Sequence, residues 1–166
     1  MTVAGKFCRS LRTITICCLL LLFAASQSAF AAAAPVIMPA SGNTKDIPLI
    51  VTAKQYLGVK YVYGGTTPRG FDCSGFVQYV FEKHKKNLPR TADIQYKAGK
   101  PVSKIKDLQP GDLVFFATGK PKDVNHVGIY IGKDQFINAQ TSKGVAIAKL
   151  TDAYWKAAYM GARRAL

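Results

Sequence analysis

Apolar residues in the first half of the chain recur at the spacing of a helix face. This spacing predicts helices over residues 46–57, 74–86 and 91–97, because residues three and four apart share one face of a helix. In the first helix, Ile50, Ala53 and Leu57 form the apolar face. Asp46 can cap its N-terminus, Pro48 suits its first turn, and Gly58 is expected to end it. In the second helix, the buried stripe is formed by Phe76, Val77, Val80 and Phe81.

The pattern changes after residue 110 to short β-rich runs that are separated by turns. We expect strands at Leu113–Ala117, Val127–Ile131, Phe136–Ala139, Val145–Ala148 and Tyr159–Arg163. Helices followed by strands predict an α+β domain in which N-terminal helices pack on an antiparallel sheet of about five strands.

The first 31 residues have the three parts of an export signal. Lys6, Arg9 and Arg12 precede an apolar run from Ile14 to Ala25, and small residues end the segment at 29–31. An uncleaved anchor is the alternative, but a dozen apolar residues fall short of the roughly 20 that span a bilayer. We therefore expect residues 1–31 to be a signal peptide, 32–45 a flexible leader and 46–166 the folded domain, with no membrane span or lipid once the signal is removed.

Removal of the signal would leave a strongly basic chain. Of the 23 Lys and Arg, 20 would remain against 9 Asp and Glu, a formal charge of +11. An exported chain with scattered lysines favours anionic cell-envelope polymers over nucleic acid as partners, and a merely solvated basic surface is the simpler alternative. We expect a monomer in the periplasm, the cell envelope or the extracellular space.

Cys73 is the single cysteine that remains after the signal. It lies where a glycine-rich loop leads into the second predicted helix, a position at which helix amide dipoles favour a thiolate. The alternative is a small buried apolar residue, which is the usual fate of a free cysteine. The position makes Cys73 a candidate nucleophile.

A catalytic thiol needs a base, and that base needs a polar group to orient it. His126 opens a predicted strand, whereas His84 lies among lysines at the end of the Cys73 helix and is expected to be solvated. Asn138 is the polar residue of the next strand. A three-residue loop at 132–134 would set Asn138 opposite Gly128 and bring its amide within reach of His126, whereas a two-residue turn would not. Structural roles for both side chains remain open.

Five motifs in order make the chain similar to the NlpC-type cell-wall cysteine peptidases, whose bacterial members share a papain-like core. The motifs are residues 61–65 (YVYGG), 70–75 (GFDCSG), 88–91 (LPRT), 108–116 (LQPGDLVFF) and 126–130 (HVGIY), and the likeness covers about residues 47–164. The resemblance implies a papain-like NlpC-type fold.

The resemblance also implies site residues. Cys73 would be the nucleophile, His126 the base and Asn138 the third catalytic position, which is histidine in many relatives. Tyr61 would stabilise the oxyanion beside the Cys73 backbone N–H. Asp72 and Ser74 match positions that hold polar groups of the substrate.

Arg90 could grip a substrate carboxylate. From the residues alone, Tyr61 could instead be core packing, Asp72 a helix N-cap and Arg90 part of a salt bridge.

The implied activity is hydrolysis of amide bonds in peptidoglycan stem peptides or cross-links, by a Cys73 thiolate paired with protonated His126. Both γ-D-glutamyl-diamino acid and D-alanyl-diaminopimelate bonds fit. The chain offers a poor zinc site, so no metal or other cofactor is expected. A wall-binding or regulatory protein without activity, and a related thiol amidase or acyltransferase, are the alternatives.

Overall fold

A computed structural model describes residues 47–119 and 123–165 of the chain. The predicted signal peptide (1–31), the predicted leader (32–45) and the proposed cap Asp46 lie outside the described residues.

The first helix, α1 (Pro48–Lys54), is shorter than predicted. Its N-cap in the described residues is Ile47, which makes no side-chain capping bond. Leu49, Ile50 and Ala53 are buried, whereas Leu57 lies beyond the helix and is 45% exposed. Because the Gly58 N–H donates to the carbonyl of Val145 at 2.8 Å, the chain leaves the helix early to join the sheet.

A small hairpin and the second helix follow. The hairpin consists of β1 (Thr66–Thr67) and β2 (Gly70–Phe71), and α2 runs over Cys73–Lys83, three residues short of its predicted end. The predicted apolar stripe of α2 is fully buried. A Cβ at Gly75 would lie 2.1 Å from the carbonyl oxygen of Gly65, so only glycine lets this loop lie against the start of α2.

The remaining elements are α3 (Ala92–Lys97), β3 (Lys100–Val102), the 3₁₀ turn η1 (Ile105–Asp107), β4 (Leu113–Phe116), β5 (His126–Gly132), β6 (Gln135–Gln140), β7 (Gly144–Lys149), α4 (Ala153–Ala158) and β8 (Tyr159–Arg164). The predicted short helix and the five predicted strands are confirmed within one or two residues at each end. The sheet has six strands in the order β3-β8-β4-β5-β6-β7, and its pairs are antiparallel. The sixth strand, β3, is only three residues long and contains Pro101, so the sequence pattern does not reveal it.

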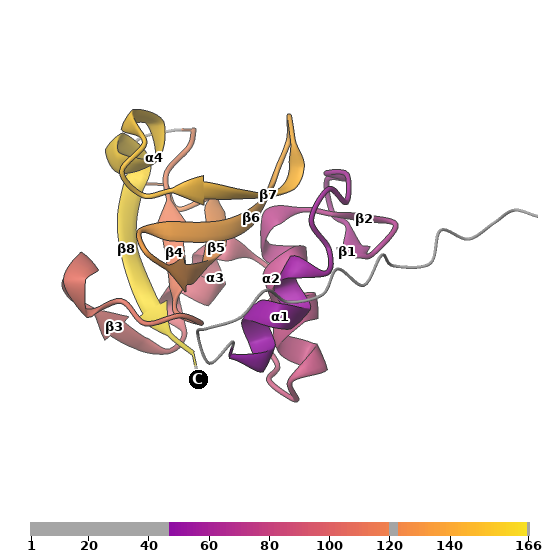
Figure 1. Ribbon diagram of the computed structural model, residues 1–166, viewed down its shortest axis with the longest axis horizontal. Coiled ribbons are helices and arrows are strands. Elements are labelled where there is room, and N and C mark those ends of the chain that lie inside the picture. Colours follow the sequence, from indigo (N-terminus) through magenta and orange to yellow (C-terminus); the bar gives the residue numbers. More distant parts are fainter. Residues whose placement is uncertain (1–46, 120–122, 166) are drawn as a thin grey trace, which may run out of the picture. The chain divides into compact units, whose positions relative to one another are not determined.

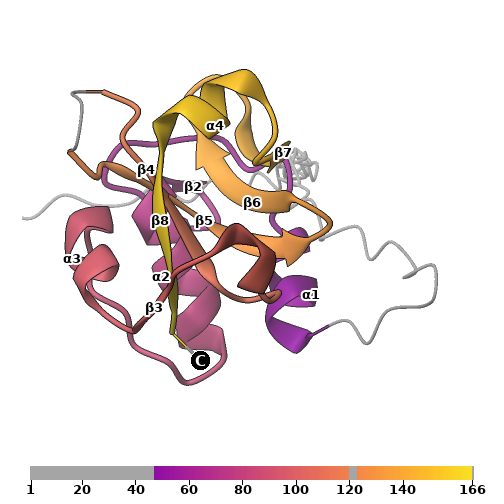
Figure 2. The same cartoon turned by 90° about the vertical axis from the view of Figure 1, so that its left-hand side faces the viewer.

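Apolar side chains cover both faces of the sheet. One face, with Phe115, Ile129 and Ile137, packs against α1 and α2. The other face, with Phe116 and Phe136, packs around Trp155 of α4. Figure 1 shows α1 and α2 together on one side of the sheet and α4 at the end of β8, and Figure 2 shows α2 lying behind β8. The predicted α+β class, with helices packed on an antiparallel sheet, is confirmed.

The β5–β6 connection reaches the predicted register by a different route. Lys133 and Asp134 both have positive φ, 52° and 58°, which is the geometry of a two-residue turn rather than the predicted three-residue loop. Gly132 pairs with Gln135, but a bulge then shifts the register so that Ile129 pairs with Ile137. The bulge adds one residue to β5, so the pairing continues with Gly128 opposite Asn138, as the three-residue loop would have arranged it. His126 and Asn138 therefore lie on the same face of the sheet.

Candidate active site

Cys73 is the first residue of α2, and its backbone is held by the residue before it. Asp72 is the N-cap, and its carboxylate accepts a hydrogen bond from the Gly75 N–H at 2.6 Å. The Cys73 side chain packs at the edge of the α1–α2 core, and the residue is only 7% exposed. The helix start thus presents one nearly buried sulfur.

The surroundings of the sulfur keep it a thiol at rest. Burial raises the pKa of Cys73 above its usual value, and the Asp72 charge raises it further, while the backbone N–H groups of Val127, Ser74 and Cys73 itself act in the opposite direction. The thiol donates to the backbone carbonyl of Asn125, with 3.7 Å between sulfur and oxygen. The backbone N–H groups around the sulfur thus favour the thiolate, as expected of a helix start, but burial and the Asp72 charge outweigh them.

His126 begins β5 and is joined to Asn138 of β6. The distance between His126 Nε2 and Asn138 Oδ1 is 3.0 Å, and both residues are buried. Asn138 Nδ2 faces the Ala146 carbonyl at 3.5 Å, so Oδ1 is the atom turned to the ring and Nε2 carries the hydrogen. This tautomer leaves Nδ1 with a free lone pair, as a base requires. The predicted proximity of the two side chains is therefore observed.

The His126 ring also has an aromatic cover. Trp155 stacks on it with ring centroids 5.2 Å apart and an interplanar angle of 29°, and the ring centroid of Phe116 lies 6.1 Å away. Burial lowers the pKa of His126, and the hydrogen bond to Asn138 only partly opposes this effect. The imidazole is therefore neutral near pH 7.

Tyr61 lies beside the chain that leads to Cys73. It forms an isolated parallel bridge with Phe71, and the Val62 N–H donates to the Phe71 carbonyl at 2.9 Å. Burial, followed by the nearby Cys73 and Asp72, raises the pKa of Tyr61, so the phenol keeps its proton. Tyr61 thus supplies a hydrogen-bond donor to the wall of the same clefts that Cys73 lines.

Two clefts meet at Cys73, and both are also lined by Tyr61, Tyr63 and Asn125. The first cleft has a volume of about 470 Å³ and runs along the start of α2 and the start of α3. Its further lining residues are Gly64, Asp72, Ser74, Arg90, Thr91, Ala92, Asp93, Asp123 and Val124.

The second cleft has a volume of about 650 Å³ and runs past His126 to the β6–β7 turn and α4. Its further lining residues are Thr118, His126, Gln140, Thr141, Ser142, Lys143, Asp152, Tyr154 and Trp155. Cys73 thus lies at the junction of the two clefts.

Asp72, Ser74 and Arg90 form one cluster beside the sulfur. Arg90 makes a two-pronged ion pair with Asp72, and its Nη1 lies 3.0 Å from Ser74 Oγ. The hydrogen bond to Asp72 raises the pKa of Arg90. The open alternatives for Asp72 and Arg90, a helix cap and a salt bridge, are thus both observed, and the guanidinium already has a carboxylate partner.

Sequence reasoning missed three residues around this site. Asn125 directly precedes β5, and its Oδ1 accepts hydrogen bonds from the N–H and the hydroxyl of Thr118, each at 2.9 Å. Gln95 is fully buried and donates to the backbone carbonyls of Ser74 and Pro89. Trp155 is far from His126 in sequence, and no local pattern marks any of the three.

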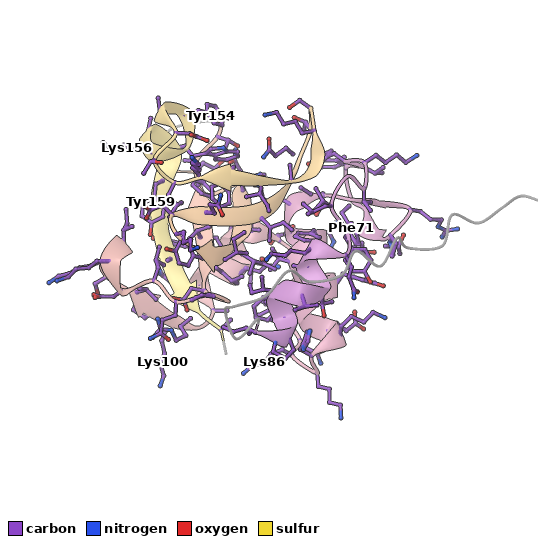
Figure 3. All side chains as sticks on the ribbon, in the orientation of Figure 1. Phe71, Lys86, Lys100, Tyr154, Lys156 and Tyr159 are labelled. Carbon is purple, nitrogen blue, oxygen red and sulfur yellow. The ribbon has the colours of Figure 1, made fainter. Side chains whose placement is uncertain are left out.

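The second histidine and the basic side chains lie outside this cluster. Although the sequence predicts a solvated side chain, His84 is half-buried, and its ring lies 2.9 Å from the Thr52 hydroxyl, so it bridges α1 and the end of α2 outside the site. Lys86 and Lys100 lie along one edge of the domain and Lys156 at the opposite corner, so these basic side chains are spread out (Figure 3). Within the described ranges no cluster of three or more His, Cys, Asp or Glu could hold a metal, and no described helix is long and apolar enough to cross a membrane.

Comparison with known proteins identifies one family and several relatives to which the chain is similar. The NlpC/P60 family matches residues 58–164. The chain is 44% identical over 123 residues to gamma-DL-glutamyl hydrolase of Bacillus subtilis, covering 73% of the chain and 30% of that protein. It is 49% identical over 110 residues to murein DD-endopeptidase MepS/murein LD-carboxypeptidase of Escherichia coli, covering 66% of the chain and 57% of that protein.

A solved structure agrees with these matches. An NlpC/P60 family protein from Bacillus cereus is similar in structure with a TM-score of 0.67 and 39% sequence identity, over 71% of this chain and 39% of that one. The chain thus spans less than two thirds of the length of each of these relatives.

Proposed function

The chain belongs to the NlpC/P60 family, and from that membership we propose that it is a cysteine endopeptidase that hydrolyses amide bonds in peptidoglycan peptides of the cell envelope. The single observation that carries the proposal is the arrangement of the site. A lone thiol at a helix start and a histidine oriented by an amide line the same open cleft. The endopeptidase names of the relatives support the substrate class.

The pKa directions favour a mechanism that starts from a neutral pair. The burial that raises the pKa of Cys73 and lowers that of His126 leaves thiol and imidazole uncharged at rest. His126 Nδ1 then takes the thiol proton as the sulfur attacks the carbonyl carbon of the substrate. The amide of Asn138 keeps the ring in the tautomer that makes this transfer possible.

The remaining steps follow from the same groups. The negative charge on the carbonyl oxygen would be stabilised by the Cys73 backbone N–H and the Tyr61 hydroxyl. His126 returns its proton to the leaving nitrogen as the C–N bond breaks, which leaves a thioester on Cys73. A water molecule, deprotonated by His126, then attacks the thioester and releases a carboxylic acid and the free thiol.

The experiment is incubation of the purified protein with peptidoglycan fragments, followed by mass spectrometry of the new termini. We expect a new amine and a new carboxylate, and Cys73→Ala should lower the rate by about 10⁴-fold or more. Wall binding that persists in both proteins with no new termini would favour a non-catalytic binder. A product with the acyl group moved to an added amine would favour an acyltransferase.

A further inference from the structure

The two clefts that meet at Cys73 differ in their position relative to His126. His126 lines the second cleft and not the first. A general acid must reach the nitrogen of the leaving amine. Under the proposed function, on which this inference rests, the second cleft therefore holds the leaving-group side of the substrate and the first cleft holds the acyl side.

The clefts also differ in charge. The first is lined by Asp93 and Asp123 in addition to the Asp72–Arg90 ion pair, so the further charges along its described wall are negative. The second is lined by one cation, Lys143, and one carboxylate, Asp152. Asp152 accepts a hydrogen bond from the Lys149 backbone N–H at 3.3 Å, and Lys143 forms no ion pair with any described carboxylate. Lys143 is thus a cation open to an incoming anion.

The turn that carries Lys143 is fixed in place. Residues 141–143 connect β6 to β7, and the next residue, Gly144, has φ +66°. A Cβ at Gly144 would lie 2.3 Å from the Val59 carbonyl oxygen, so the turn is pressed against the segment that leads to Tyr61. The Val145 N–H donates to that same carbonyl at 2.8 Å. Lys143 is therefore held at the cleft wall rather than on a free loop.

We propose that Lys143 forms a carboxylate-binding subsite for the residue that supplies the scissile nitrogen. When that residue is an amino acid with a free α-carboxylate, the negative group lies two bonds from the leaving nitrogen and close to the wall of the second cleft. The subsite would make the enzyme select stem-peptide bonds whose leaving residue keeps this carboxylate free over bonds whose leaving residue is amidated there. An ammonium group is a point charge, so we expect charge selectivity rather than a two-pronged geometry.

The test uses two synthetic stem-peptide fragments that differ only at the diamino acid supplying the scissile nitrogen, whose α-carboxyl group is free in one and a primary amide in the other. We expect kcat/KM to be about fivefold higher for the free carboxylate, the strength of a good exposed ion pair. Lys143→Met should bring the ratio close to one, and Lys143→Arg should retain it. Lys149→Met, at the exposed far end of β7, is the matched control for net charge and should keep the wild-type ratio.

The same pair of fragments is measured for binding to the Cys73→Ala variant, with and without Lys143→Met. Binding that favours the carboxylate only when Lys143 is present supports the subsite. A preference that survives Lys143→Met, or that Lys149→Met abolishes equally, overturns it. Absence of turnover with carboxylate-selective binding intact would contradict the proposed reaction and not the subsite, so the two failures are distinguishable.

Discussion

The candidate site contains two pairs of polar side chains that are held in different ways. One pair is Asp72 and Arg90, beside Cys73, and the other is His126 and Asn138. On the nucleophile side, Asp72 and Arg90 are both charged and compensate each other, and the pair is partly open to solvent. On the base side, His126 and Asn138 are buried and uncharged, and a single hydrogen bond joins them. The charged pair thus lies where solvent reaches the site, whereas a hydrogen bond between uncharged groups orients the buried His126 ring.

Changing Asn138 should have the largest effect on the base side. Asn138→Ala removes the group that selects the Nε2–H tautomer, and we expect kcat/KM to fall by roughly 10²-fold. Asn138→Asp should instead keep the orientation but add a charge that favours the imidazolium. Rates on a peptidoglycan fragment as a function of pH separate the two variants.

The direction of the pH effect is fixed by the burial of His126. Because burial lowers the pKa of His126, the acid limb of the wild-type kcat/KM profile should lie below the ordinary histidine value of 6.5. The Asn138→Asp profile should move to higher pH. An unmoved profile would show that His126 is not the titrating base.

On the nucleophile side the largest expected effect is on stability. Asp72→Ala removes the N-cap of α2 and leaves Arg90 without its partner, so we expect unfolding to require about 2 kcal/mol less free energy. Asp72→Ser is the matched variant, because serine also caps helices but carries no charge. Urea denaturation that ranks both variants equally would show that the ion pair, rather than the cap, dominates.

The buried histidine should also make stability depend on pH. An unfolded chain binds a proton on His126 below pH 6.5, whereas the folded protein binds it only at lower pH, so the contribution of neutral His126 is complete above 6.5 and is lost as pH falls. We expect His126→Gln to lose less stability than the wild type between about pH 7.5 and about pH 5.5. Equal losses in urea titrations would contradict this assignment.

The smallest expected effect is a change in thiol reactivity. Because the Asp72 charge raises the pKa of Cys73, Asp72→Asn should lower that pKa, and Arg90→Met, which leaves the charge uncompensated, should raise it. The rate of alkylation by iodoacetamide as a function of pH measures both shifts. Shifts in the same direction would show that the two side chains do not act on the sulfur as an ion pair.

Sequence alone accounts for the features that depend on neighbouring residues. The stripe of α2, the position of Cys73 at its start and the strands from Leu113 onward follow from side-chain spacing, because helices and strands expose their faces at fixed periods. The alternation of β5 and β6 likewise limits His126 and Asn138 to one shared face once the register has the right parity.

Tertiary packing determines how that parity arises and what surrounds the site. The two-residue turn at Lys133–Asp134 would by itself have separated His126 from Asn138, and a bulge corrects the register. The stacking of Trp155 on His126 and the pairing of Arg90 with Asp72 join residues that are distant in sequence. Such contacts form only when the connecting loops bring distant elements together. The spacing of neighbouring residues therefore cannot predict them.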